Sequence, residues 1–572
     1  MDAKSAFFND IPGFIPIAAI PPNTDTARVA AEAISRLNAW EADALTHQAI
    51  WRDFVALTGT YRTLFSRDTV HSVFSKLSLA KNRSPLELAP REPRIEHCLE
   101  ESKWIDVDFG FHTYEGGLRG EAEGTASMVL CYDGQWRIWM IRTWLECFDG
   151  YGSPDTWIPP YESRNLNSNV ASQEPTNGNQ TNGSAHAQDE LLDLAIIGGG
   201  QAGLSLAGRS QAVGLNYVLL ERNSSVGDVW KTRYESLTWH TPKQYGELPF
   251  GQTFDRDDPL LIPTKRIAAA HKAWAERYRI NVETNCDVEG AEWNDRTAIW
   301  TVRTSSGTFI AKTVAICIGG GSASPVSPSW ATPEKVRSSQ YSGTIIHGAQ
   351  YHNCHEFAGK RGIVVGTANT GHDVAQDMLQ ANMQTTILQR GPTFVMPIEW
   401  LHGGMAPHYN DKLPTERGDR EAFTLPNKIF REVLNRNVHS AIDANAARFD
   451  ALEKVGFQLD RYGDLATHIY IRFGGHYIDH GCSAKIASGE IRVINKEVKR
   501  LTQNGLLFVD GSEIEVDFIV CCTGFNHDFR RQTRALIGDI ADRVDPYLGM
   551  DAEGEIRGLS RPSGRKSSSR SL

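Results

Sequence analysis

The sequence predicts an α/β protein with two parallel-sheet units, preceded by a smaller α+β domain. Apolar residues 194–197 run into the glycine-rich stretch 198–203, and residues 362–365 run into a second such stretch, 366–371. An apolar strand, a tight glycine turn and a helix, in this order, form a Rossmann-type dinucleotide-binding unit. Alternating apolar residues between 103 and 141 predict long strands in front of both units.

Composition limits the class of protein. The 572 residues are 41% hydrophobic and 22% charged, which is typical of a globular chain of about three domains. The net charge of −10 argues against nucleic acid or an anionic membrane as a partner, because both would repel the chain. The sequence has no run of 18 apolar residues and no apolar leader after Met1, so we expect a cytoplasmic protein.

The cysteines predict no metal and no disulfide. There are nine of them, an odd number, and none forms a C-x-x-C pair. This pattern is typical of reduced, mostly buried thiols. It weakens both a zinc site and a redox-active disulfide, so we predict that the protein has no metal site.

The first glycine turn predicts a phosphate cradle. Gly198 makes the turn, Gly200 lets the backbone approach a pyrophosphate, and Gly203 allows close packing of the helix on the strand. Gln201 and Ala202 open this helix, whose free N–H groups and positive dipole favour phosphates. The alternative is a glycine-rich turn that binds nothing.

The strand after this helix favours the nucleotide. It covers residues 217–220 and ends in Glu221 and Arg222, with the acid 18 residues after Gly203. An acid at this place holds a ribose hydroxyl of a dinucleotide. We therefore predict a nucleotide site that includes both residues.

The second glycine turn differs from the first in charge. It comprises Gly366, Thr367, Ala368, Asn369, Thr370 and Gly371, with an alanine in place of the middle glycine. The next strand ends in Arg390 instead of an acid. An arginine pairs with a 2′-phosphate that an acid would repel, so the second unit is predicted to prefer NADPH to NADH.

The N-terminal region predicts helices and then strands. Apolar residues in 26–65 have helical spacing and predict two or more amphipathic helices. Residues 104–111, 126–131 and 136–141 alternate, and the turn at 132–135 joins the last two as a hairpin.

Helices followed by a meander of long strands resemble the cone-shaped domains of the nuclear transport factor 2 (NTF2) type, also called SnoaL-like. The phrase Asp133-Gly134-Gln135-Trp136-Arg137-Ile138 supports this resemblance. Such a cone often encloses a pocket, which Trp104, Trp136, Trp139 and Trp144 could line. The interpretation that we favour is that these tryptophans fill a core or a dimer interface. We expect a homodimer through this domain and assign no chemistry to it.

The segment after Glu221 carries the most specific motifs. Gly227-Asp228-Val229-Trp230 is followed by His240-Thr241-Pro242-Lys243-Gln244 and by Leu248-Pro249. These phrases resemble class B flavin monooxygenases, the group of flavin-containing monooxygenases and plant indole-pyruvate monooxygenases. In that family the segment wraps the isoalloxazine ring, so the resemblance implies that Trp230, His240 and Gln244 lie beside the flavin. For His240, which is Asn in animal members, a structural hydrogen bond is the alternative.

Two further stretches support the resemblance. Residues 341–351 are similar to the family fingerprint F-x-G-x-x-x-H-x-x-x-F/Y, with Gly343 and His347 at its glycine and histidine. Residues 517–525 are similar to its strand-to-glycine junction, which implies that Thr523 and Gly524 lie near a nucleotide. We expect His347 to organise the crossing between the two units; the alternative is a structural histidine of a loop or core.

The resemblance implies the activity of a monooxygenase with FAD in the first unit and NADPH in the second. NADPH would reduce the flavin, which would capture O₂ as a C4a-hydroperoxide and oxygenate a small organic substrate. The flavin would carry most of the chemistry, with His240 and Asn369 as catalytic candidates. The fingerprint ends in Tyr351 where Baeyer–Villiger members have Trp, which favours N- or S-oxygenation or keto-acid decarboxylation over lactone formation. The absence of a C-x-x-C pair disfavours a disulfide-type flavin reductase.

Composition and motifs together predict the domain boundaries. Residues 163–190 are rich in Asn, Ser, Gln, Thr and Gly and predict a flexible linker. The predicted parts are the NTF2-like domain (1–162), the linker, the first part of the FAD-binding domain (191–340), an NADPH-binding domain with an insertion (341–500), a return to the FAD-binding domain (501–563) and a disordered tail (564–572).

The last residues depart from the family. In the family, a segment similar to residues 554–564 leads into a strand and a helix that close the FAD domain. In this sequence the basic, serine-rich residues 565–572 follow instead. The departure motivates a second hypothesis, that the chain is a truncated, catalytically impaired flavoprotein homologue that acts as a binding or interaction protein. Oxidation of NADPH by the chain would exclude it.

Overall fold

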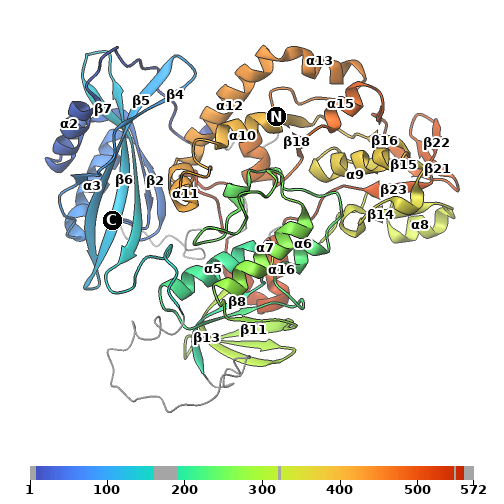
Figure 1. The fold of residues 1–572 in the computed structure, drawn as a ribbon, viewed down its shortest axis with the longest axis horizontal. Helices are drawn as coiled ribbons and strands as arrows, with labels where there is room; N and C mark the ends of the chain where they lie inside the picture. Colours follow the sequence, from blue (N-terminus) through green and yellow to red (C-terminus); the bar gives the residue numbers. More distant parts are fainter. Residues whose placement is uncertain (1–7, 160–189, 320–323, 546–548, 560–572) are drawn as a thin grey trace.

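The two Rossmann units lie side by side, and the N-terminal domain packs on the first unit and on the helical segment 398–454, away from the sheet of the second unit (Figure 1). The computed structural model describes residues 8–159, 190–319, 324–545 and 549–559. The predicted linker, apart from Glu190, and the predicted tail lie outside these residues. The predicted α/β class with two Rossmann units is confirmed.

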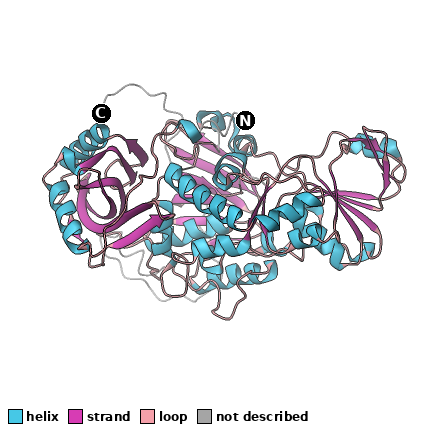
Figure 2. Cartoon of the chain, turned by 90° about the horizontal axis from the view of Figure 1, so that it is seen from above, coloured by secondary structure: helices cyan, strands magenta, loops and turns pink. Residues whose placement is uncertain are grey.

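The N-terminal domain is a seven-stranded sheet in the order β2-β1-β7-β6-β5-β3, with β4 paired to β5. All pairs are antiparallel except β1 with β7. Figure 2 shows that the sheet is curved and has helices along its outer side. The elements are α2 (Thr26–Asn38), β1 (Leu45–Phe54), β2 (Tyr61–Phe65), α3 (Arg67–Ala80), β3 (Glu87–Leu88), β4 (Arg94–Cys98), β5 (Ser102–Glu115), β6 (Leu118–Leu130) and β7 (Trp136–Phe148).

The prediction of helices throughout 26–65 is wrong. Only α2 is regular α-helix there, and β1 and β2 follow it. Residues 49–53 of β1 are buried without alternation, because Trp51 packs on Phe74 of α3 while Arg52 pairs with Glu555 at 2.7 Å. A strand that is buried on both faces loses the period-two pattern that identifies strands in a sequence. The predicted hairpin at 132–135 is confirmed by the bond from Cys131 N to Gln135 O, 2.9 Å.

The first Rossmann unit has the strand order β10-β9-β8-β13-β12-β11. Strands β10, β9, β8 and β13 are neighbours in this order and run parallel. The carboxyl ends of β8 and β9 therefore meet at one edge of the sheet. Its elements are β8 (Leu191–Ile197), α5 (Gln201–Ala212), β9 (Tyr217–Leu220), α6 (Asp228–Lys231), α7 (Thr264–Arg277), β10 (Val282–Glu283), β11 (Val288–Asn294), β12 (Ile299–Thr304) and β13 (Gly307–Ile316).

The second Rossmann unit has the all-parallel order β14-β23-β15-β16-β19. Its helix α9 (Asn369–Gln380) follows the second glycine turn. The strands are β14 (Thr344–His347), β15 (Arg361–Val365), β16 (Gln384–Leu388), β19 (Arg492–Ile494) and β23 (Phe518–Cys521). Helix α8 (Pro333–Ser339) precedes β14, and the small sheet of β20 (Val498–Leu501), β21 (Gly505–Phe508) and β22 (Glu513–Glu515) follows β19.

A helical insertion lies between β16 and β19 and reaches toward the N-terminal domain (Figure 1). Its two short strands, β17 (Phe394–Pro397) and β18 (His476–Asp479), pair in parallel. Its helices are α10 (Ile398–Met405), α11 (Thr415–Phe423), α12 (Asn427–Ala444), α13 (Ala446–Lys454), α14 (Leu465–Thr467) and α15 (Cys482–Ala487).

The chain returns to the first unit later than predicted. Strand β23 belongs to the second sheet, so residues 501–521 do not lie in the FAD-binding unit. Helix α16 (Phe529–Ile537) then packs on β11 of the first sheet. Residues 549–557 contact the N-terminal domain, where Glu553 and Glu555 pair with Arg62 and Arg52. An apolar strand alone does not indicate which of two adjacent parallel sheets it joins.

Candidate dinucleotide and flavin sites

The first glycine turn is shaped for a phosphate. Gly198 has φ +104°, and a Cβ atom there would lie 2.6 Å from the carbonyl oxygen of Cys317. A Cβ on Gly203 would lie 1.9 Å from the carbonyl oxygen of Gly198, so α5 approaches the turn as closely as glycine allows. A Cβ on Gly200, by contrast, would meet no atom within 4 Å. The backbone in front of α5 is therefore open to a pyrophosphate, flanked by Gln201 and Ala202.

Glu221 lies beside this turn. Its side chain is buried, one carboxylate oxygen accepts from Gly199 N at 2.7 Å, and the other accepts from Asn223 N at 2.8 Å. These bonds fix the carboxylate between the ends of β8 and β9, which is where a ribose would bind. Arg222 follows with an exposed side chain.

The second turn repeats this geometry. Gly366 has φ +116°, and a Cβ on Gly371 would lie 2.2 Å from the carbonyl oxygen of Gly366. Ala368 stands at the N-cap of α9, the position that Gly200 has at α5. Arg390 is exposed just beyond β16, as Glu221 follows β9 in the first unit. In the strand register, Gln389 takes the place of Glu221 and Arg390 that of Arg222, so the second unit keeps the arginine and lacks the acid.

Asn369 is hydrogen-bonded to the insertion. Its Oδ1 accepts from Ile478 N at 2.8 Å, so its amide links α9 to β18. Thr367, in the turn, shares a hydrogen bond of 2.5 Å with Thr393, and Thr370 follows Asn369 in the first turn of α9. These contacts give Asn369 a positioning role between the second turn and the insertion.

His240 faces a carboxylate from α9. Its Nε2 lies 3.9 Å from Asp373 Oδ2 and has no hydrogen-bond partner among the described residues. Asp373 accepts from Tyr234 Oη at 2.7 Å and contacts His480 Nε2 at 2.8 Å. The rings of His240 and His480 lie 4.9 Å apart. Asp373 thus joins three side chains from the flavin-side segment and the insertion.

Burial and charge act in opposite directions in this cluster. Burial lowers the pKa of His240, and Asp373 offsets part of that effect. Burial alone would also lower the pKa of His480, but its hydrogen bond to Asp373 raises it above the usual value. His240 is therefore held neutral while His480 favours its cationic form. His240, Asp373 and His480 each offer a ligand atom within 4.8 Å of the others, a set that could also hold a cation.

The other predicted flavin-side residues frame the same region. Trp230 packs edge-on against Trp239 with ring centroids 5.6 Å apart. Gln244 donates from Nε2 to Asp411 at 2.7 Å, and its carbonyl oxygen accepts from Thr415 Oγ1 at 3.0 Å. The insertion therefore holds Gln244 through the start of α11.

The fingerprint residues lie at β14, the first strand of the second unit. His347 Nδ1 accepts from Ala349 N at 3.1 Å, and its ring packs on Phe525 at 5.4 Å. Gly343 is required sterically, because a Cβ there would lie 2.5 Å from Asp517 O. Thr523 donates to Val326 O at 2.5 Å, and Gly524 O accepts from Val326 N. His347 also pairs with Cys521 of β23, and its organising role stays a prediction.

The sequence did not single out Tyr234, Asp373 or His480 as site residues. Tyr234 and Asp373 lie within or next to the motifs, six residues before His240 and two after Gly371, so their spacing was a usable signal. His480 lies in the insertion, more than 200 residues from His240, and only the fold brings the two together.

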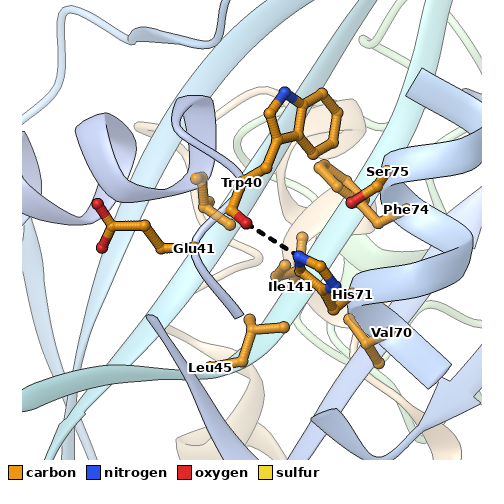
Figure 3. Close-up of a pocket in the computed structure, with 9 residues that line it drawn as sticks. Trp40, Glu41, Leu45, Val70, His71, Phe74, Ser75 and Ile141 are labelled. Atoms are coloured by element: carbon orange, nitrogen blue, oxygen red, sulfur yellow. Dashed lines mark hydrogen bonds between the residues drawn. The ribbon is translucent and has the colours of Figure 1, made fainter. Parts of the chain in front are cut away.

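The N-terminal domain has a filled interior. Trp104, Trp139 and Trp144 are buried, and the first two rings lie 5.5 Å apart. The cavity beside Trp40 and His71, shown in Figure 3, has a volume of about 10 Å³. It holds one water molecule at most.

The cysteines and the helices bear on two other roles, a reactive thiol and a membrane span. All nine cysteines are free, and burial raises the pKa of Cys521 to about 12. Such thiols are poor nucleophiles. None of the helices in the described part of the chain is both long enough and apolar enough to span a bilayer.

Comparisons with known proteins identify relatives. Residues 195–415 match the family model described as "Pyridine nucleotide-disulphide oxidoreductase". The probable indole-3-pyruvate monooxygenase YUCCA4 of Arabidopsis thaliana is 27% identical over 335 residues, which cover 58% of this chain and 74% of that protein. Indole-3-pyruvate monooxygenase YUCCA1 of Oryza sativa subsp. japonica is 27% identical over 58% of this chain and 76% of its own length.

Solved structures give weaker matches. The flavin-containing monooxygenase from Stenotrophomonas maltophilia has a TM-score of 0.42 and 17% identity, over 64% of this chain and 85% of that one. Cyclohexanone monooxygenase from Rhodococcus sp. Phi1 bound to NADP⁺ has a TM-score of 0.42 and 18% identity, over 60% of this chain and 72% of that one.

Proposed function

We propose that this chain, a relative of the flavin-dependent monooxygenases, is an FAD- and NADPH-dependent monooxygenase of small organic molecules. Its motifs predicted this relationship, and the relatives found by comparison support it. The observation that carries the proposal is the pair of glycine turns, with an acid, Glu221, after the second strand of the first unit and a base, Arg390, in the second.

The first unit would hold FAD. Gly198 to Gly203 would receive its pyrophosphate on backbone N–H groups, and Glu221 would receive its ribose. FAD supplies the redox and oxygen chemistry when bound. Trp230, His240 and Gln244 would enclose its ring and exclude water.

The second unit would hold NADPH. The turn from Gly366 to Gly371 repeats the cradle, and Arg390 would pair with the 2′-phosphate. Thr523 and Gly524, at the end of β23, would border the nucleotide from the neighbouring strand.

His240 would act on the reacting region through its unpartnered Nε2. Its low pKa keeps the ring neutral at pH 7, so Nε2 can accept or donate one hydrogen bond according to the tautomer. Asp373 and His480 lie beside the ring, with Asp373 Oδ2 3.9 Å from His240 Nε2 and the two imidazole rings 4.9 Å apart. Asn369, tied to β18, would position the second turn instead of touching the substrate.

The class of substrate is part of the proposal. N- or S-oxygenation and keto-acid decarboxylation are favoured over lactone formation because Tyr351 stands at the end of the fingerprint. The plant relatives carry indole-3-pyruvate in their names. An aromatic keto acid is therefore a first substrate to try.

The assembly and location are also proposals. Ile17 and Ile95 are exposed on the N-terminal domain, which supports a homodimer through that domain. Light scattering of the purified chain tests this. A cytoplasmic location is proposed from the sequence, which has no run of 18 apolar residues.

Oxygen-dependent NADPH consumption tests the function. Purified protein loaded with FAD would be mixed with NADPH and with indole-3-pyruvate, a tertiary amine, a thioether or a cyclic ketone, and the products identified by mass spectrometry. We expect an oxygenated or decarboxylated product from one probe. NADPH consumption that yields only hydrogen peroxide with every probe would contradict a monooxygenase.

A further inference from the structure

A pocket of about 520 Å³ opens between the N-terminal domain and helix α11. Four separate stretches of the chain line it: the β1–β2 hairpin, the end of β7 with the turn after it, the end of α5, and α11. Pockets of this volume accept small organic molecules.

The wall of this pocket is aromatic. The rings of Phe54 and Tyr61 lie 4.3 Å apart and tilt by 36°, so they form one continuous surface. Tyr151 and Phe423 line the pocket from other sides and are 40% and 46% exposed. Gathering large, exposed apolar side chains around one hollow is typical of a binding site.

The polar groups of the wall are already paired. Trp144 Nε1 donates to Glu146 at 2.6 Å, and Arg420 pairs with Glu146 at 2.6 Å and Asp155 at 2.5 Å. Asp419 accepts from Tyr409 Oη at 3.0 Å, and burial raises its pKa. Arg420, the one cation among the residues that line the pocket, pairs with Glu146 and Asp155, and Asp419 is held by the Tyr409 hydroxyl. The wall therefore offers ring faces and no free cation for an anionic ligand.

The pocket adjoins the first glycine turn. Asp419 and Phe423 also line a second pocket, of about 340 Å³, whose other walls include Gln201, Ser205 and Tyr245. The rings of Phe423 and Tyr245 stack with centroids 6.3 Å apart. The two pockets therefore share a wall, formed by Asp419 and Phe423.

We propose that the pocket between the N-terminal domain and α11 is a binding site for an uncharged aromatic small molecule. The fit comes from ring faces on several sides and from a wall whose one cation, Arg420, is already paired with acids, so that nothing favours an anionic ligand. This gives the N-terminal domain, whose own interior is filled, a role in ligand binding at its junction with the flavin unit. The proposal stands on direct binding and does not depend on the oxidation reaction.

N-phenyl-1-naphthylamine, an uncharged aromatic probe that brightens in apolar surroundings, tests the site. We expect saturable binding to the full chain, whether or not FAD is bound. Val213→Trp places an indole in the pocket and should weaken binding by about tenfold or more. Leu215→Trp, two residues away and outside the lining, is the matched control and should bind as the native chain does.

A second variant separates weaker binding of the probe from misfolding of the chain. Phe423→Ala removes an exposed ring, so the chain should keep its thermal unfolding midpoint while the probe binds several-fold more weakly. Absence of saturable binding, equal affinity in Val213→Trp and Phe423→Ala, or tighter binding of the anionic naphthalenesulfonate analogue would overturn the proposal. A chain that binds the probe but not FAD would refute the proposed oxidation and leave this site intact.

Discussion

At the scale of single residues, two glycines of the first turn are required for different reasons, one for the fold and one for a ligand. Gly203 is needed for the fold, because a Cβ would collide with Gly198 O at 1.9 Å. Gly200 is needed only for a ligand, because its missing side chain faces open space. Ala368 at the equivalent place in the second turn shows that one methyl group is tolerated there.

This difference predicts opposite outcomes for two substitutions. Gly200→Val should abolish FAD binding and change the free energy of unfolding by less than about 1 kcal/mol. Gly203→Ala should cost about 3 kcal/mol or more, because backbone must move. Flavin absorbance and urea unfolding measure the two effects. Equal loss of stability in both variants would contradict this assignment.

Arg390 should set the choice of nicotinamide cofactor. A charge-assisted bond to a phosphate contributes about 1.5–3 kcal/mol, so Arg390→Ala should raise the KM for NADPH roughly 10- to 100-fold and leave that for NADH nearly unchanged. Arg492→Ala, on the exposed edge strand β19, is the control. An unchanged ratio of the two KM values would remove Arg390 from the site.

Because of His271, we expect the free energy of unfolding to fall in acid. The ring is fully buried, neither nitrogen has a hydrogen-bond partner among the described residues, and burial lowers its pKa from 6.5 to about 4. Between these two values the unfolded chain binds a proton that the folded chain does not, so the free energy of unfolding falls as the pH falls from 6.5 to 4. His271→Phe should flatten this fall in urea unfolding measured at several pH values. An equally steep fall in the variant would exclude His271 as a cause.

At the scale of elements, α11 connects the N-terminal domain to the flavin-side segment. Arg417 pairs with Asp108 of β5 at 2.8 Å, and Arg420 pairs with Glu146 of β7. At the start of the same helix, Thr415 bonds to Gln244 O and Glu416 accepts from Phe250 N at 3.1 Å. One short helix thus carries contacts to both sides of the junction.

Removing one of these arginines should loosen the junction. Arg420→Ala leaves Glu146 and Asp155 without their shared cation and should cost about 1–3 kcal/mol of unfolding free energy. Lys485→Ala, which breaks an exposed pair with Glu490, should cost less than about 0.5 kcal/mol. Thermal unfolding of both variants measures the difference, and equal midpoints would show that the α11 contacts add no stability.

The elements that the sequence predicted well are those with local signals. Both glycine turns, their helices and the 132–135 hairpin follow from residues close together in the chain. Strand β1 was missed because it is buried on both faces. The sheet that β23 joins and the contact of His480 with Asp373 depend on packing between distant segments, which a single sequence does not encode in any local pattern.

At the scale of the whole molecule, side chains from separate folding units meet at their junctions. His240 of the first unit, Asp373 of the second and His480 of the insertion lie together. The N-terminal domain adds a wall on the far side of α11. Each unit is recognisable from the sequence, but the pocket at their junction exists only in the assembled chain.

Anaerobic reduction of bound flavin tests the central claim most directly. The purified chain, saturated with FAD, would be mixed with NADPH or NADH under nitrogen in a stopped-flow instrument, and the loss of flavin absorbance near 450 nm, roughly the usual flavin maximum, followed over time. We expect the chain to retain FAD and NADPH to bleach it much faster than NADH. A chain that takes up no FAD, or whose flavin is reduced equally fast by both nucleotides, would contradict it.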